Sequence, residues 1–252
     1  MSERRSKFFG LVLFLILIIG FSYLMVTGSK VSHKEFYNQI VISENNLLPA
    51  EEYLRYAGLN NSAEYTDLTL IDVKSRIEKH PYLRKAEVEF DGVNTILVEV
   101  EEKEMKAALL QKNEIKLITS DLETLPLFPP ASIEDLPVIS SLNFKEKTPP
   151  DENDMKYAFR IIDALSCTDT CLSKNLAEIN LRRKGDVILT FTGMQFPFLF
   201  GKNDEAKKAL IIKDLWQELI DDPILLNNTE YIDLRYKNRV FIGKRKTELA
   251  GG

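Results

Sequence analysis

The stretch LIDVKSRIEKHPYLRKAEVEFDGVNTILVEVEE, residues 70–102, decides the fold because its hydrophobic period changes within a few residues. Leu70, Val73 and Ile77 recur at spacings of three and four, with charged side chains between them. This spacing predicts an amphipathic helix. Pro81 follows and stops it, because proline has no N–H to donate within a helix.

The second half of the same stretch predicts two paired strands. Apolar and charged residues alternate over 86–90 and again over 96–101, and the Asp91-Gly92 turn separates them. Upstream, Phe36–Ile42 has the composition of a strand, and a short helix is expected between Pro49 and Gly58. Two helices on one face of a small sheet form a sound α+β unit, which we expect over residues 34–104.

The rest of the chain predicts a larger β-rich domain over residues 105–243 with flanking helices, so the expected fold class is α+β. We expect amphipathic helices around 155–165 and 209–219, with Asn203 capping the second and Pro223 beyond its end. Leu125–Val138 has four prolines and reads as an extended connection. Strands are expected at 107–110, 115–118, 177–182, 186–191, 195–200, 231–236 and 239–242. Residues 244–252 are expected to be a disordered tail.

The N-terminus predicts a membrane anchor. Residues 8–26 carry no charge and number nineteen, close to the roughly 20 apolar residues that span a bilayer as a helix. Arg4, Arg5 and Lys7 precede this run, so residues 1–7 are expected to be a cytoplasmic tail. The alternative is a cleaved signal peptide, but its apolar core is usually shorter, about 7–15 residues. The expected location is the cytoplasmic (inner) membrane, with one span and the bulk of the chain outside the cytoplasm.

Charge and composition exclude several classes of function. The net charge is −5, and the first seven residues carry +2, which leaves −7 for the part expected outside the membrane. Such a surface gives no footprint for nucleic acid. Cys167 and Cys171 could form a local disulfide or remain two free thiols, and both alternatives stay open. Two cysteines and two histidines give little material for a metal site.

No catalytic motif stands out in the sequence. It contains no G-x-S-x-G, H-E-x-x-H, C-x-x-C, P-loop or G-x-G-x-x-G pattern. His80 ends an apolar helix face and Trp216 lies on one, so packing roles are expected for both. We therefore expect no enzyme, no cofactor, no metal and no small-molecule substrate. An interaction protein is the simplest alternative, with strand edges as candidate sites.

The last two strands are the candidate edge. Alternation puts Tyr231, Asp233 and Arg235 on one face, and Ile232, Leu234 and Tyr236 on the other. One set packs on the core, and the other is either a solvated face or a partner surface.

At this point the chain resembles the FtsQ/DivIB family of bacterial cell-division proteins. The helix followed by His80-Pro81-Tyr82, the paired strands and Glu102-Lys103 resemble the family's POTRA module. The segment 232–236, IDLRY, and then Val240-Phe241-Ile242 resemble its closing strand pair. The order of a basic N-terminus, one span, a POTRA module and a β domain is also similar.

The sequence departs from the family pattern at several turns. Ser43-Glu44-Asn45 lacks the glycine usual after the first POTRA strand, and Met105 replaces a proline before the domain junction. The turn at Asp121-Leu122-Glu123-Thr124 also lacks its glycine. The pair Cys167 and Cys171 is not typical of the family.

The resemblance implies a non-catalytic scaffold of the division machinery at the septum. Its partners are then small bitopic division proteins of the FtsB/FtsL type, which bind the last strands by β-strand addition. The residues expected at that contact are Tyr231, Asp233, Arg235, Tyr236, Val240 and Phe241. Two alternatives are a POTRA-bearing component of outer-membrane assembly or secretion, and an anchored cell-wall enzyme that uses exposed carboxylates.

Overall fold

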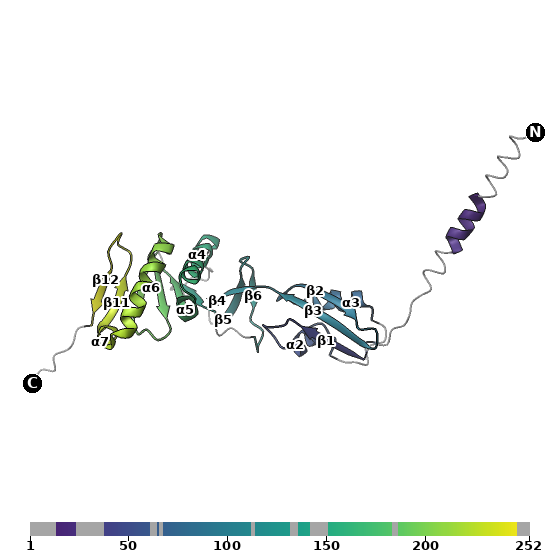
Figure 1. Ribbon diagram of the computed structural model, residues 1–252, viewed down its shortest axis with the longest axis horizontal. Helices are drawn as coiled ribbons and strands as arrows, with labels where there is room; N and C mark the ends of the chain where they lie inside the picture. The colour runs from purple at the N-terminus through teal and green to yellow at the C-terminus, as the bar shows by residue number, and fades with distance from the viewer. Residues whose placement is uncertain are drawn as a thin grey trace, which may run out of the picture.

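The computed structural model describes residues 14–23, 38–60, 65, 68–111, 114–131, 136–141, 151–182 and 186–245. Within these ranges the protein is α+β, with a three-stranded sheet and a nine-stranded sheet that follow one another along the long axis (Figure 1). The strands are β1 (Gln39–Ser43), β2 (Leu83–Phe90), β3 (Thr95–Glu102), β4 (Met105–Gln111), β5 (Glu114–Thr119), β6 (Thr124–Pro126), β7 (Val138–Ser141), β8 (Leu176–Leu181), β9 (Val187–Phe191), β10 (Phe198–Leu199), β11 (Thr229–Asp233) and β12 (Phe241–Lys244). The helices are α2 (Ala50–Tyr56), α3 (Leu70–Ile77), α4 (Glu152–Thr168), α5 (Thr170–Asn175), α6 (Glu205–Asp221) and α7 (Pro223–Asn228).

The first unit has the predicted two helices and three strands. Its strand order is β1-β3-β2, with β1 parallel to β3 and β2 antiparallel to it. Helix α3 begins at a capping box, in which the Thr69 hydroxyl accepts from the Asp72 N–H and the Asp72 carboxylate accepts from the Thr69 N–H. Val73 and Ile77 of α3 are buried against the sheet, as their spacing predicts. The helix and the hairpin predicted from residues 70–102 are confirmed.

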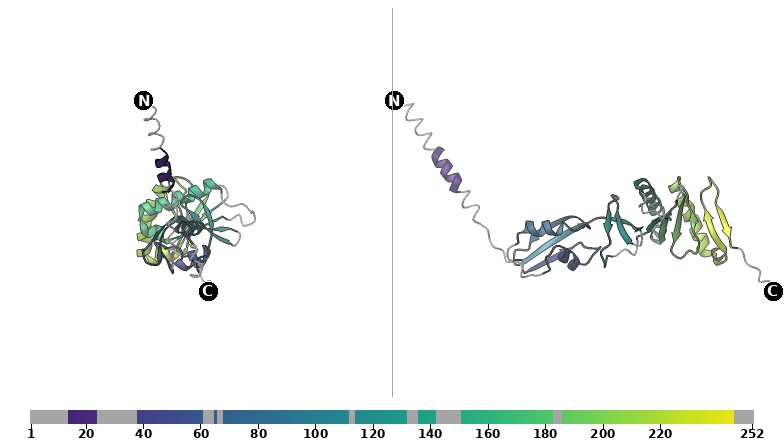
Figure 2. Two further views of the ribbon diagram at one scale, coloured as in Figure 1. Left: turned by 90° about the vertical axis from the view of Figure 1, so that its right-hand side faces the viewer. Right: turned by 180° about the vertical axis from the view of Figure 1, so that it is seen from behind.

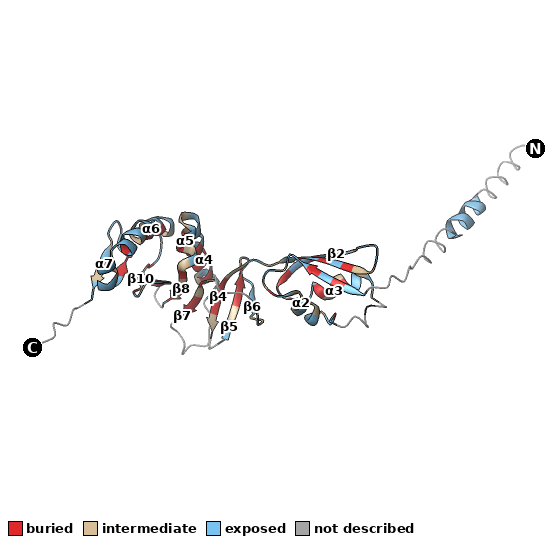
Figure 3. Ribbon diagram, turned by 60° about the horizontal axis from the view of Figure 1, so that its bottom comes forward, coloured by how far each residue is buried: buried red, intermediate tan, exposed pale blue. Residues whose placement is uncertain are grey.

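The second unit is built on a mixed sheet in the order β12-β11-β10-β9-β8-β7-β4-β5-β6. Helices α4 and α6 pack against each other and against the sheet, so a large apolar core forms on that side (Figure 2). Phe191 and Trp216 lie in this core with ring centroids 5.2 Å apart. Figure 3 shows buried positions along β4, β7 and β8 and on the inner sides of the helices.

Several expected boundaries in this unit were wrong. Strand β10 has two residues instead of six, and the last strands are 229–233 and 241–244 instead of 231–236 and 239–242. Pro223 lies beyond the end of α6, as expected, and it begins the short helix α7, which the Asp222 carboxylate caps. Asn203 does not cap α6: the N-cap is Asp204, which has a left-handed backbone and no capping hydrogen bond.

The two units are joined by a packed junction. The Tyr82 hydroxyl donates to the carbonyl of Pro126 and accepts from the N–H of Phe128, both at 2.9 Å. Ala108 and Leu117 of the second sheet belong to the buried cluster of the first unit. The segment after β6 therefore belongs to the packing of both units and is more than a connection.

Two of the turns that depart from the family pattern each contain a non-glycine residue in the left-handed backbone region. Glu44 has φ 62° and Leu122 has φ 66°. Residues other than glycine rarely adopt this backbone region, because it costs them roughly 1–2 kcal/mol per residue. Both turns therefore contain a residue in a conformation that glycine would adopt without this cost.

Residues 14–23 form a helix whose side chains are all exposed. They are the described part of the predicted span over 8–26, and the rest of that span and the predicted tail 1–7 lie outside the described residues. Among the described helices, none has the length and apolarity needed to cross a bilayer. Of the predicted tail, Lys244 ends β12, and residues 246–252 lie outside the described ranges.

Candidate functional site

The terminal hairpin, β11 and β12 with their connection 234–240, lies at the end of the larger sheet. Strand β12 is the outermost strand and pairs with β11 on one side. Figure 1 shows it at the end of the molecule farthest from the three-stranded sheet. Within the described residues, no strand pairs with its other side.

Along β12, the N–H and C=O groups of alternate residues point away from β11. The N–H groups of Ile232 and Leu234 donate to β10 and its flanks at 3.1 and 3.0 Å. Because successive residues of a strand face opposite sides, Tyr231 and Asp233 face β12 and pair with Gly243 and Phe241. The N–H and C=O groups of Ile242 and Lys244 therefore point away from the sheet. They are available to an incoming strand.

Two of the predicted contact residues form a structural pair instead. The Asp233 side chain is buried, with 4% exposure. Its carboxylate accepts from Nε and Nη2 of Arg235 at 2.9 and 2.7 Å, and from the main-chain N–H of Arg235 at 3.0 Å. These hydrogen bonds hold the pKa of Asp233 below its usual value. Asp233 is therefore committed within the protein and is not a free contact.

The Arg235 side chain also lies against a neighbouring turn. Its Nη1 is 3.3 Å from Oδ2 of Asp186, and its stem crosses Gly201. A Cβ at Gly201 would lie 2.8 Å from Cγ of Arg235, and the glycine has φ 67°. The Gly201 carbonyl accepts from the hydroxyl of Tyr157 on α4 at 3.0 Å. This contact chain fixes the base of the hairpin to α4.

The exposed face of the terminal hairpin is aromatic. Tyr236 is 56% exposed, Phe241 46% and Tyr231 36%. The rings of Tyr236 and Phe241 meet edge to face with centroids 4.9 Å apart. The ring of Tyr231 lies over Gly243, where an added Cβ would overlap it. Val240, also a predicted contact, instead packs against the core together with Ile242.

A groove of about 180 Å³ runs between the connection of the terminal hairpin and the start of α6. Six of its lining residues are cations and one is acidic, Asp204. The cations are Lys202, Lys207, Lys208, Arg235, Lys237 and Arg239. This groove was not predicted from the sequence, although Lys and Arg are dense over residues 202–208 and 235–239.

Three of these cations are already engaged. Lys208 is buried and donates to the carbonyls of Phe200 and Lys202 at 2.7 and 3.0 Å, and burial lowers its pKa. Arg235 binds Asp233, and Lys207 donates to the Asn238 side chain. Lys202, Lys237 and Arg239 form no ion pair with a described residue, so they remain available to an anionic group.

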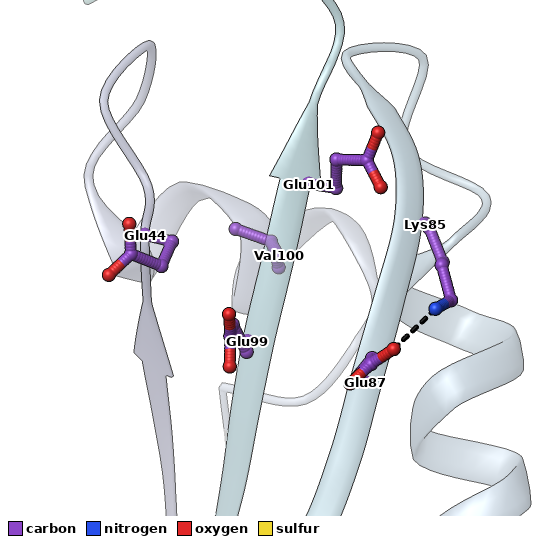
Figure 4. Close-up of a pocket in the computed structure, with 6 residues that line it drawn as sticks. All are labelled: Glu44, Lys85, Glu87, Glu99, Val100 and Glu101. Atoms are coloured by element: carbon purple, nitrogen blue, oxygen red, sulfur yellow. Dashed lines mark hydrogen bonds and ion pairs between the residues drawn. The ribbon is translucent and has the colours of Figure 1, made fainter.

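A second, acid-lined hollow of about 340 Å³ lies on the open face of the three-stranded sheet (Figure 4). It is lined by Glu44, Glu87, Glu99 and Glu101, and Lys85 pairs with Glu87. The hydrogen bond from Lys85 lowers the pKa of Glu87, which favours the charged form and opposes a role as a general acid. Among the residues described, no cluster of His, Cys, Asp or Glu has the makings of a metal site.

The two cysteines are free thiols in the structure. Cys167 lies near the end of α4 and Cys171 near the start of α5, and both are exposed. Of the two alternatives left open above, the structure has the free thiols.

The comparisons with known proteins concern the first unit. Residues 37–103 match the family model described as the POTRA domain, FtsQ-type. This range covers the three-stranded sheet with α2 and α3. No curated protein matches the chain.

Proposed function

We propose that the chain is a protein of the FtsQ/DivIB family and a non-catalytic scaffold of the bacterial division machinery. The FtsQ-type POTRA domain over residues 37–103 supports this proposal. The chain recruits small bitopic division proteins of the FtsB/FtsL type. A partner segment adds as a strand to β12. The observation that carries the proposal is the free outer side of β12 beside an exposed aromatic face.

In this mode of binding, the backbone of β12 provides affinity and the side chains beside it provide specificity. The outward N–H and C=O groups of Ile242 and Lys244 bond to the backbone of any incoming strand. Tyr236 and Phe241 select apolar side chains on the exposed face, because aromatic surface is the most effective anchor at an interface. Lys202, Lys237 and Arg239 favour acidic residues next to the partner strand.

We further propose that residues 8–26 anchor the protein in the cytoplasmic membrane with the N-terminus inside. The support is the apolar run with its preceding cations and the helix over 14–23 with exposed side chains. Confinement to one membrane raises the effective concentration of bitopic partners, so a short strand contact suffices for assembly.

The hairpin contact is tested by pull-down of the full chain with its FtsB-type partner. Ile242→Pro removes an outward N–H and no bond to β11, so we expect binding to fall at least about tenfold. Because the Ile242 side chain packs against the core, folding of the variant is checked by the fluorescence of Trp216. The double variant Tyr236→Ala/Phe241→Ala has a similar effect on binding. Its matched control is Leu210→Ala/Ile224→Ala, which removes exposed apolar side chains from α6 and α7. Full binding by Ile242→Pro and by the aromatic double variant would refute this contact.

The topology is tested with the two exposed cysteines, the only ones in the chain. A membrane-impermeant maleimide labels Cys167 and Cys171 in intact spheroplasts if the β domain is outside the cytoplasm. Labelling with and without a mild reductant also reports whether the thiols pair in the cell. Labelling that requires detergent contradicts the proposed orientation.

The cellular role is tested by depletion. Loss of a division scaffold gives filamentous cells with blocked septation, and the wild-type chain restores division while Ile242→Pro does not. Normal division after depletion contradicts the proposal as a whole.

A further inference from the structure

The two sheets end in four edge strands, and the protein protects two of them. Strand β2 presents Arg84, Lys85, Glu87 and Glu89 as exposed charges, and β6 has three residues and ends in Pro126. Charges, proline and short length are the usual devices that prevent edge pairing. The other two edges, β1 and β12, lack them apart from Lys244. The edge at β12 is the proposed contact of the terminal hairpin, whereas β1 has no part in that contact.

Strand β1, QIVIS, is an uncharged edge with free backbone groups. The N–H of Asn38 donates to the carbonyl of Asn94 beside β3 at 2.9 Å. By alternation, Ile40 and Ile42 also face β3, and the backbone groups of Gln39, Val41 and Ser43 face away. In the described part of the chain, β3 is the strand that pairs with β1.

The open face beside this edge has an apolar spot and uncompensated acids. Val41 and Leu97 are opposite each other in the register and are 38% and 45% exposed. Glu99 lies opposite Ser43, and Glu44 follows directly (Figure 4). Neither Glu44 nor Glu99 forms an ion pair with a described residue, whereas Glu87 is bound by Lys85. Ser43 is small, so a long cation at the edge can reach across it to Glu99.

We propose that β1 is a second docking edge, which takes an extended cationic segment of a partner protein. Side chains of an added strand alternate, so every second residue falls on the open face. The residue beside Val41 packs on the Val41–Leu97 pair. The next residue on that face, beside Ser43, places a lysine or arginine between Glu44 and Glu99. This edge belongs to the POTRA unit and is independent of the terminal hairpin.

The probe is the fluorescein-labelled peptide Val-Thr-Val-Thr-Lys-Thr-Lys, tested by anisotropy against the full chain in a neutral detergent. A second peptide with glutamate in place of lysine is the charge control. We expect about tenfold tighter binding of the lysine peptide, with a preference that shrinks at high salt. Hydrogen exchange of the amides of residues 39–43 slows when the lysine peptide binds.

Two variants test where the peptide binds and whether Glu99 causes the preference for lysine. Val41→Pro removes an outward N–H without breaking a bond to β3, and it lowers lysine-peptide binding at least about tenfold. Glu99→Lys removes or reverses the preference between the peptides, while the matched control Glu114→Lys on β5 leaves it unchanged. Because Glu99→Lys alters an exposed side chain, it keeps the test valid if Val41→Pro fails to fold.

Three outcomes overturn the proposal. The first is the absence of slowed exchange at residues 39–43 with saturating or millimolar lysine peptide. The second is equal binding of the two peptides, or a preference that survives Glu99→Lys. The third is loss of peptide binding in Ile242→Pro but not in Val41→Pro, which would assign the peptide to β12. The third outcome leaves the hairpin proposal intact, so the failures of the two proposals are distinguishable.

Discussion

The pair Asp233 and Arg235 gives the sharpest test of how the terminal hairpin is held. The perturbation is Arg235→Ala. It removes both side-chain hydrogen bonds to a carboxylate that is only 4% exposed, and leaves the main-chain N–H at 3.0 Å. If the pair is structural, the main effect is on the stability of the β domain. If Arg235 is mainly a partner contact, stability changes little.

The magnitude follows from the geometry. A hydrogen bond to a charged group contributes about 1.5–3 kcal/mol, and leaving a buried charge without its partner costs about 3–5 kcal/mol. Solvent screens this pair, because the Arg235 side chain is 38% exposed. We therefore expect the free energy of unfolding to fall by about 2–3 kcal/mol at pH 7.

The loss of stability caused by Arg235→Ala is expected to be smaller in acid than at pH 7. Hydrogen bonds from Arg235 lower the pKa of Asp233 in the folded state, whereas the unfolded value is about 3.9. The stability that this pair contributes is therefore fully present above that unfolded pKa, and is lost as the pH falls through the lower folded pKa. In Arg235→Ala the carboxylate can protonate more easily, so the cost of the substitution shrinks in acid.

The assay is urea unfolding of the full chain in detergent, followed by the fluorescence of Trp216. This is the only tryptophan of the chain, and it packs on Phe191 in the core of the β domain. The matched control is Arg239→Ala, an exposed arginine in the same hairpin without an ion pair to a described residue, and we expect a change below about 0.5 kcal/mol. The reasoning is refuted if Arg235→Ala costs as little as this control, or if its cost is equal at pH 7 and at about pH 3.5.

Three further outcomes follow from single residues. Glu44→Gly relieves a backbone with φ 62° and raises the stability of the POTRA unit by about 0.5–1 kcal/mol in thermal unfolding; a lower stability would contradict the strain. Gly201→Ala places a Cβ 2.8 Å from Cγ of Arg235 and costs about 2–3 kcal/mol by Trp216 fluorescence, more than Gly193→Ala, which has φ 82° and open space; equal costs would exclude the contact. Burial lowers the pKa of His80 to about 4, whereas in the unfolded chain this histidine takes up a proton below about pH 6.5. The free energy of unfolding is therefore highest above pH 6.5 and falls as the pH is lowered towards 4. His80→Gln should flatten this dependence of the free energy of unfolding on pH.

Local sequence patterns were sufficient for the first unit. The period of three to four over Leu70–Ile77, the alternation over the next two strands and the Asp91-Gly92 turn each depend on near neighbours in the chain. Because these signals agree with one another, the helix and the hairpin could be predicted and were confirmed. The family resemblance drawn from the same stretch is supported by the FtsQ-type POTRA match.

Local patterns were insufficient at the boundaries of the second unit. Alternation continues from Tyr231 to Tyr236, yet β11 ends at Asp233, because the carboxylate turns back onto the N–H and guanidinium of Arg235. The strand expected at 195–200 is only Phe198–Leu199, and the alternation of residues in the sequence did not predict so short a strand. Pro223 follows α6, as expected, but the short helix α7 that it begins, capped by Asp222, was not predicted.

The sequence by itself determined the alternation of apolar and polar residues, the uncharged N-terminal run and the charge balance, all of which are properties of neighbouring residues. The tertiary structure decided which strands lie at sheet edges, which acids are paired and which cations remain available. Those properties depend on contacts between residues far apart in the chain, such as Asp186 with Arg235 and Ser43 with Glu99. Only the pairing of all the described strands therefore shows that β1 and β12 each have one side without a partner strand in the described part of the chain.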